Sequence, residues 1–139
     1  MNTKQMQRTN RAFTLLESLL VLFVVSMLAL GLSGGVGTAF RSVQETVFLW
    51  EFEHLYRESQ KLAVSSQEEV VLQVGTSQLS NGYQEVAFPA TVSVLEDRSV
   101  VFNREGGNSS LAKVRFQLAD KRVDYQLYIG SGRYKKTEE

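Results

Sequence analysis

One acidic residue, Glu17, lies inside an apolar run that extends from Phe13 to Leu32. An ionisable side chain in an apolar segment of this length costs about 2.5–3.5 kcal/mol on membrane-insertion scales, and it usually marks a function. The chemistry open to such a carboxylate is to pair with a cation, because a paired charge costs far less than a lone one. A basic leader, Met1–Ala12, precedes the run and contains no acid; its cations are Lys4, Arg8 and Arg11.

The apolar run is long enough to cross a membrane as a helix. A helix of about 20 residues spans about 30 Å, the thickness of a bilayer core. The cations on its N-terminal side predict a single crossing, with the leader in the cytoplasm and the C-terminal part outside the cell. The alternatives are a plain single-pass anchor and a secretory signal peptide with a weak cleavage site near Ala29–Gly31. Neither alternative accounts for Glu17.

The segment Ala12–Glu17, placed behind a basic leader, resembles the processing motif of type IV prepilins and pseudopilins. The family usually has Gly before the cut, where this chain has Ala12. The resemblance implies that a prepilin peptidase cleaves between Ala12 and Phe13 and then N-methylates Phe13. It also implies that the amine freed at Phe13 pairs with Glu17, within the subunit or on a neighbour. Such a pair sets the axial register of bundled helices, as a buried polar pair does in a coiled coil.

Glycines are concentrated around the end of the apolar run, and they are Gly31, Gly34, Gly35 and Gly37. Each glycine inside a helix costs about 0.8–1 kcal/mol relative to alanine, so the segment is predicted to break or loosen the helix. Close helix–helix packing through these small residues is an alternative that does not exclude the first. A capping box at Ser42–Glu45 predicts that the helix restarts after the glycines, at Arg41.

An amphipathic helix is predicted to follow and to end near Ser65–Ser66. At about 100° per residue, one apolar stripe contains Phe48, Leu49, Phe52, Leu55, Tyr56, Leu62 and Ala63. Glu53 and Arg57 lie on the opposite side and are spaced for an i,i+4 ion pair. Trp50 also lies outside the stripe, which makes it a candidate interface residue. The alternative is that its ring lies over neighbouring aliphatic stems.

From Gln67 onward the hydrophobic pattern changes to a period of two. The predicted strands are Val70–Val74, Glu85–Phe88, Thr91–Leu95, Ser99–Asn103, Leu111–Leu118 and a last strand with Val123, Tyr125, Leu127 and Ile129 pointing inward. This one-sided alternation predicts a small antiparallel sheet whose apolar face is covered by the helix stripe.

The last ten residues, Gly130–Glu139, are predicted to form a polar tail. The tail contains a short basic and aromatic stretch, Arg133, Tyr134, Lys135 and Lys136. Such residues can make weak contacts to the phosphates and base faces of DNA. Glu138 and Glu139 offset the charge, so a solvated tail is the alternative.

Together these elements predict an α+β fold of the pilin-like kind. A long N-terminal helix, transmembrane in its first half and amphipathic in its second half, packs on a small antiparallel β-sheet. The predicted segments are a leader at 1–12, a transmembrane and assembly helix at 13–33, a glycine-rich break and amphipathic helix at 34–66, and the sheet with its polar tail at 67–139.

Composition excludes several kinds of site. The chain has 139 residues, a formal net charge of zero and no cysteine, so it has no disulfide, thiolate nucleophile or cysteine metal site. The single histidine, His54, has no second histidine or cysteine with which to bind a metal, and it is read as a surface residue of the helix. No nucleophile–base set or phosphate loop is recognisable. We therefore expect neither an enzyme nor a metal or cofactor.

The closing segment Gly130–Tyr134 is similar to the end of the competence pseudopilins of Gram-positive bacteria, and the lack of cysteine fits that group. The resemblance implies a minor pseudopilin of a DNA-uptake pseudopilus, required for transformation, anchored in the cell membrane and displayed at the cell surface when assembled. The implied partners are other pseudopilins, the prepilin peptidase, an assembly ATPase, a platform membrane protein, membrane lipid before assembly, and DNA indirectly. A type II secretion pseudopilin and a plain membrane-anchored binding protein are the alternatives.

Overall fold

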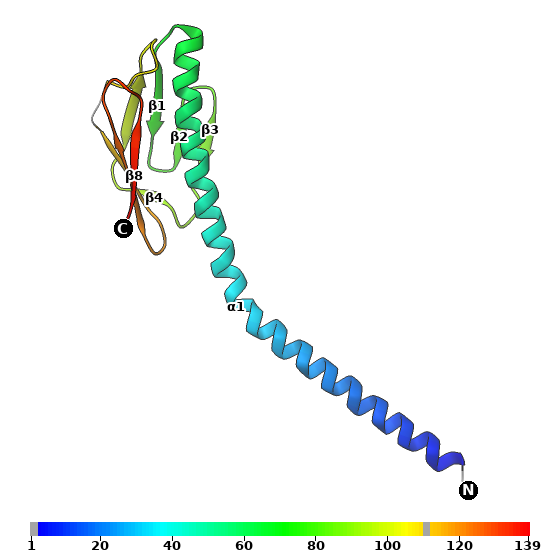
Figure 1. Ribbon diagram of the computed structural model, residues 1–139. Coiled ribbons are helices and arrows are strands. Elements are labelled where there is room, and N and C mark those ends of the chain that lie inside the picture. Colours follow the sequence, from blue (N-terminus) through cyan, green and yellow to red (C-terminus); the bar gives the residue numbers. More distant parts are fainter. Residues whose placement is uncertain (1–2, 110–111) are drawn as a thin grey trace. The chain divides into compact units, whose positions relative to one another are not determined.

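The computed structural model describes residues 3–109 and 112–139, with side chains from Thr14 onward (Figure 1). The chain divides into two compact units, one up to Phe40 and one from Arg41 to Glu139. A single helix, α1 (Thr3–Ser66), contributes to both units, and the second unit adds all of the strands. The layout is α+β and pilin-like, as the sequence predicts.

Helix α1 continues without interruption through the four glycines, so a break there is wrong, whereas the loosening of the helix stays a prediction. A β-carbon added at any of them would meet nothing within 4 Å among the described residues. Once a helix has nucleated, each further residue adds a hydrogen bond, and this cooperativity outweighs the modest propensity cost of glycine.

The predicted helix restart at Arg41 is wrong for the same reason, and its capping box does not form. Glu45 is only 5% exposed. Its Oε1 accepts a hydrogen bond of 2.9 Å from the backbone N–H of Ala119, far along the chain. The acid that resembled a local cap therefore makes a tertiary contact.

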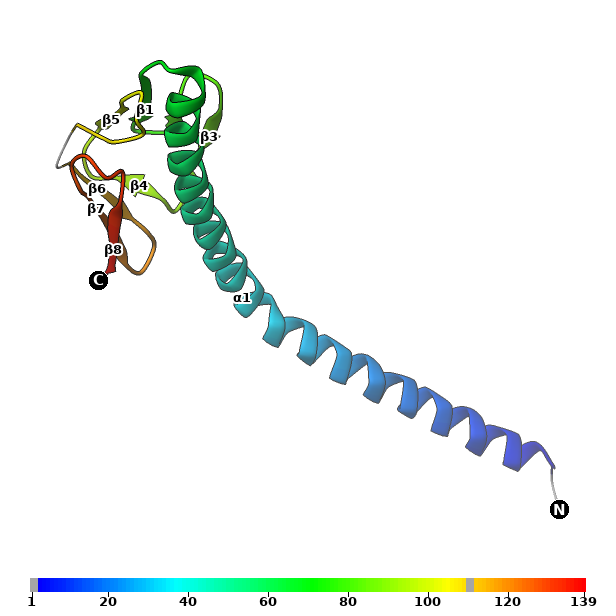
Figure 2. The same cartoon turned by 45° about the horizontal axis from the view of Figure 1, so that its top comes forward.

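The strands form two antiparallel sheets of four rather than the one small sheet that was predicted. The first has the order β3 (Glu85–Ala87), β2 (Gln78–Ser80), β1 (Val70–Val74) and β5 (Arg98–Phe102). The second has the order β4 (Ser93–Val94), β6 (Lys113–Gln117), β7 (Arg122–Leu127) and β8 (Tyr134–Glu138). Figure 2 shows both sheets alongside the C-terminal part of α1.

The segment predicted to be a polar tail contains an edge strand, β8. It pairs with β7 in a register that runs from Val123 opposite Glu138 to Leu127 opposite Tyr134. Four of its five residues are exposed, so backbone pairing holds it to the sheet more than apolar burial does. The side chains of such a strand show no clear alternation of apolar and polar residues from which a strand could be predicted. The strand β2, only three residues long, was also missed.

The core lies between the apolar stripe of α1 and the inner faces of both sheets. The predicted stripe is confirmed, because all of its residues are buried in this core except Leu62, which is half-buried. Aromatic rings meet edge to face at its centre, where the Phe52 and Phe116 ring centroids lie 5.0 Å apart and those of Phe48 and Phe116 5.2 Å. Such ring pairs stabilise the core beyond the contribution of the apolar area that they bury. Ile129, predicted to point inward, is 56% exposed because β7 ends at Leu127.

Polar side chains of α1 reach the loops and strands around this core. Ser59 is fully buried, and its Oγ accepts a hydrogen bond of 3.1 Å from Asn81, in the turn after β2. Gln60 Nε2 donates to the carbonyl oxygen of Gly106 at 2.7 Å, in the loop after β5. Glu45 of α1 likewise binds Ala119, in the turn between β6 and β7. Together these three contacts fix the position of each sheet along α1.

Gly132 is predicted to be the glycine least able to accept a side chain. Its φ is +61°, and an added β-carbon would lie 2.7 Å from the carbonyl oxygen of Gly106 and against the Gln60 carboxamide. Gly82 provides the matched control, because its φ is +85° but nothing lies within 4 Å. Gly82→Ala should cost about 1–2 kcal/mol of unfolding free energy from backbone strain, and Gly132→Ala clearly more. Urea unfolding in detergent, followed by near-UV circular dichroism, measures both; equal losses would contradict the crowding of Gly132.

Candidate processing and assembly site

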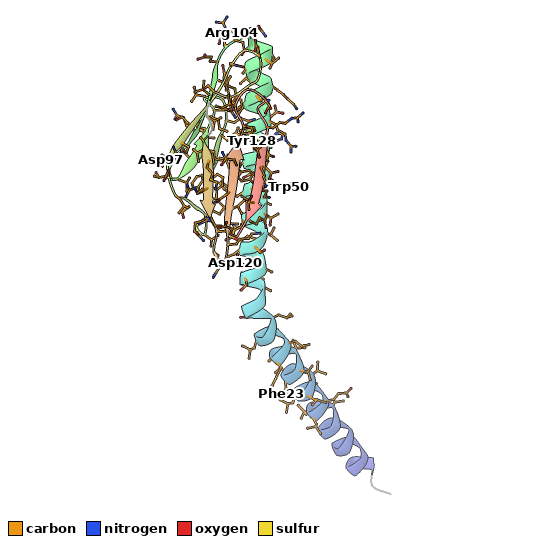
Figure 3. All side chains as sticks on the ribbon, turned by 60° about the vertical axis from the view of Figure 1, so that its left-hand side comes forward. Phe23, Trp50, Asp97, Arg104, Asp120 and Tyr128 are labelled. Atoms are coloured by element: carbon orange, nitrogen blue, oxygen red, sulfur yellow. The ribbon has the colours of Figure 1, made fainter. Side chains whose placement is uncertain are left out.

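Glu17 lies on a part of α1 that its own chain leaves uncovered. Every described side chain from Thr14 to Phe40 is exposed, and Leu15 and Leu16, which directly precede the acid, are each 66% exposed. Phe23, labelled in Figure 3, projects from the same bare helix surface. This part of the helix is long and apolar enough to cross a membrane. An apolar surface of this size needs lipid or neighbouring helices to cover it.

Two hydroxyl groups in this segment donate to carbonyl oxygens of the helix itself. Ser18 donates to the carbonyl oxygen of Thr14 at 2.8 Å, and Ser26 donates to that of Leu22 at 2.7 Å. Glu17 is the one charged residue between Phe13 and Arg41, and it makes no ion pair with the side chains that the structure describes. Its carboxylate is thus a charged group for which the described side chains supply no counterion.

The predicted cleavage junction, Ala12–Phe13, lies outside the residues whose side chains are described. The backbone at both positions belongs to α1. Residues four apart on a helix lie on one face, one turn from each other. Position 13 and Glu17 therefore share a face, which is the spacing that a pair between a terminal amine and a carboxylate requires.

Trp50 is 73% exposed, so most of its ring is uncovered by neighbouring stems. Figure 3 shows it on the helix in the second unit. It borders a groove of about 780 Å³ between α1 and β3, whose walls include Val47, His54 and Val86. An exposed tryptophan beside a groove is the kind of residue that anchors interfaces.

The four candidate DNA-contacting residues do not stay together. Tyr134 packs into the second unit, with its ring centroid 5.3 Å from that of Tyr56 and 5.4 Å from that of Tyr125. Lys136 Nζ lies 3.4 Å from Glu53 Oε1 and 3.6 Å from Glu138 Oε1. Strand β8 therefore separates these side chains.

Arg133, Lys135 and Lys136 are exposed, and Tyr134 is half-buried. Arg133 and Lys135 are the two cations of the stretch for which no carboxylate partner is found within 14–109 and 112–139. They differ in this from Lys136, whose charge is shared with two carboxylates.

Glu53 joins α1 to the second sheet and does not form the predicted pair with Arg57. Its Oε1 accepts a hydrogen bond of 2.9 Å from the Tyr125 hydroxyl, and the same oxygen lies beside Lys136. Burial raises the pKa of Tyr125 far above its ordinary value, and the bond to Glu53 raises it further. Tyr125 is therefore a permanent donor to Glu53 at physiological pH.

Two other groups around β8 have shifted pKa values. Burial raises the pKa of Tyr56, an effect that the hydrogen bond from Asn108, 3.2 Å long, partly offsets. The hydrogen bond from Lys121 at 3.0 Å lowers the pKa of Glu138, and Lys136 lowers it further. The Asn108–Tyr56 and Lys121–Glu138 bonds have no signal in the local sequence pattern, because each joins residues that lie far apart in the chain.

Comparison with known proteins gives two matches. Residues 7–33 match the family of the prokaryotic N-terminal methylation motif. Over 129 residues the chain is 50% identical to the competence protein ComGD of Streptococcus pneumoniae (strain ATCC BAA-255 / R6). The aligned residues cover 93% of this chain and 81% of that protein. No solved structure matches.

Tyr125→Phe is expected to loosen the attachment of α1 to the second sheet. Loss of the bond to Glu53 should lower the free energy of unfolding by about 1–2 kcal/mol at neutral pH. The folded chain keeps the Tyr125 proton at pH values above 10, the ordinary tyrosine pKa, where the unfolded chain releases it. Wild-type stability therefore falls as pH rises above that value.

The Tyr125→Phe variant should lose less stability over the same pH range, as measured by urea unfolding at several pH values. Tyr83→Phe, at a tyrosine that is 72% exposed, is the matched control and should follow the wild type. An unchanged pH profile in Tyr125→Phe would contradict the assigned role of this hydroxyl.

Proposed function

This chain belongs to the ComGD family of competence pseudopilins, and from that membership we propose how its first helix is processed and assembled. It is a minor pseudopilin of the competence machinery for DNA uptake, with a pilin-like structural role and a membrane-anchoring apolar helix. The observation that carries the proposal is the carboxylate of Glu17, which has no ion-pair partner among the described side chains and lies on a helix surface whose described residues, Thr14 to Phe40, are all exposed.

The proposed processing is a cut between Ala12 and Phe13 by a prepilin peptidase, followed by N-methylation of Phe13. The match to the N-terminal methylation motif over residues 7–33 supports this proposal, as does the cationic leader. Cleavage removes that leader and creates a positive amine at the start of an apolar helix.

In the proposed assembly, this amine pairs with Glu17 in the same subunit or in a neighbour. Pairing offsets the cost of about 2.5–3.5 kcal/mol for burying an isolated charge in an apolar setting. The carboxylate is thus costly in the precursor and compensated in the mature filament. Because the pair forms at one axial position, it selects a register among otherwise uniform apolar helices.

The proposed topology places the leader in the cytoplasm and the second unit outside the cell. Before assembly, lipid covers the helix from Phe13 to residue 33; afterwards, neighbouring pseudopilin helices do. The prepilin peptidase, an assembly ATPase and a platform membrane protein are the further partners. Trp50 is the proposed contact between the second unit and an adjacent subunit. The family match favours this function over a secretion pseudopilin or a plain membrane-anchored binding protein.

N-terminal sequencing of the mature protein from membranes tests the processing. The expected sequence begins at methylated Phe13, in cells with an active prepilin peptidase. Full-length protein beginning at Met1 should accumulate when the peptidase is deleted, which provides the control. A mature start near Leu32 would instead identify a secretory signal peptide and contradict the proposed cut.

Glu17→Val tests the assembly role. The variant should insert into the membrane at least as well as the wild type, because it removes the insertion cost of the charge. It should nevertheless reduce transformation to background, because the amine at Phe13 loses its partner. Ser26→Val is the matched control, since the Ser26 hydroxyl is already bonded to the Leu22 carbonyl oxygen. Normal transformation by Glu17→Val would remove the proposed pair.

A further inference from the structure

A cavity of about 460 Å³ lies between α1 and the start of β8. Three of its lining residues are cations, and none is an acid. Arg57 and Lys61 come from α1, and Arg133 comes from the segment that enters β8. The lining is completed by Tyr56, Gln60, Gly132 and Tyr134.

The charges of this cavity are nearly unneutralised within the described residues. Neither Arg57 nor Arg133 makes an ion pair there. Lys61 Nζ lies 3.4 Å from Glu58 Oε1, but this pair spans one helical turn and its lysine is 74% exposed, so it adds little. The groove beside Trp50 differs, because three acids, Glu51, Glu53 and Glu85, share it with Arg57. The preference for an anion therefore belongs to the cavity at β8.

The cavity wall is held in place before any ligand arrives. Gln60 Nε2 donates to the Gly106 carbonyl oxygen, and its carboxamide lies in the space that a side chain at position 132 would need. Tyr134 packs on Tyr56, so the residue that follows Arg133 is anchored to α1. Arginine side chains present a planar fork that matches phosphate oxygens, and here two of them, from different segments of the chain, line the same cavity.

We propose that this cavity binds the phosphodiester backbone of double-stranded DNA. The choice of DNA rests on the proposed function, because a competence machinery handles that polymer; the preference for phosphate rests on the cavity itself. The three cations would neutralise adjacent phosphates without reading bases, so binding is independent of sequence. Of the four residues suggested by the sequence, Arg133 carries the charge of this site, whereas Lys136 is already paired with Glu53 and Glu138.

The test uses the full mature chain in non-ionic detergent micelles and a fluorescein-labelled duplex of random sequence. Fluorescence anisotropy from low to moderate salt gives the affinity and its salt dependence. The expected slope of log affinity against log salt is about −2 to −3, since each neutralised phosphate contributes about −0.9. The double variant Arg57→Gln/Arg133→Gln should bind more weakly at every salt concentration and lose about 2 from that slope.

Arg98→Gln/Arg104→Gln is the matched control, because it removes two exposed arginines at β5 and just after it. It should keep the wild-type slope. Arg57→Lys/Arg133→Lys keeps the charge and should restore most of the slope, which separates loss of charge from misfolding; near-UV circular dichroism checks the fold of every variant.

Three results would overturn the proposal. They are no binding of the duplex by the wild type, an unchanged slope in Arg57→Gln/Arg133→Gln, and binding of a poly(glycerol phosphate) polymer without binding of DNA. These results leave the assembly role intact, since Glu17→Val tests that role through transformation and not through DNA binding. The failure of one proposal is thereby distinguishable from the failure of the other.

Discussion

The helix α1 has to satisfy two different surroundings along one continuous backbone. From Arg41 onward its apolar stripe is buried by the chain's own sheets, whereas from Thr14 to Phe40 every described side chain is exposed. Burial of apolar area is the main favourable term in both folding and association. The second unit therefore holds the described core, and the first unit depends on lipid or other subunits. This division explains why a protein with a small domain of its own has an N-terminal helix so much longer than that domain needs.

Within the second unit, apolar burial selects which face of α1 is covered, and polar contacts select its position along the axis. An aromatic stripe alone would tolerate sliding, because one ring can replace another at similar cost. Glu45, Ser59 and Gln60 each bond to a different loop, and Glu53 bonds to the second sheet. A shift of one turn would leave the buried groups of Glu45 and Ser59 without partners, which is expensive in a protein interior, and would also break the bonds of half-buried Glu53 and Gln60.

The sequence predicted those parts of the fold in which burial follows a local period. The stripe from Phe48 to Ala63 was predictable because 3.6-residue spacing identifies a buried helix face, and β1 was recovered with its bounds because its residues alternate between buried and exposed. Strand β8 was missed because pairing with β7, which no local pattern reveals, holds its exposed side chains in place. Local rules also misread Glu45 as a helix cap and Glu53 as half of an i,i+4 pair, since the true partners, Ala119 and Tyr125, lie more than seventy residues away.

The two proposed sites have one feature in common, which is a charge without a counterion among the described residues. Two acids of the second unit have a cation beside them: buried Asp124 has Lys113 at 3.4 Å, and half-buried Glu53 has Lys136 at the same distance. Buried Glu45 instead accepts a hydrogen bond from the backbone N–H of Ala119. Glu17 and the cavity lined by Arg57 and Arg133 lack such pairing. Glu17 is an isolated anion on an apolar surface, whereas the cavity is lined by cations. A terminal amine is the small cation that fits a helix bundle, and a phosphodiester is the repeating anion that fits an open basic cavity. In both proposals the partner comes from beyond the subunit or from its processing, which is the arrangement expected of a subunit of a larger assembly.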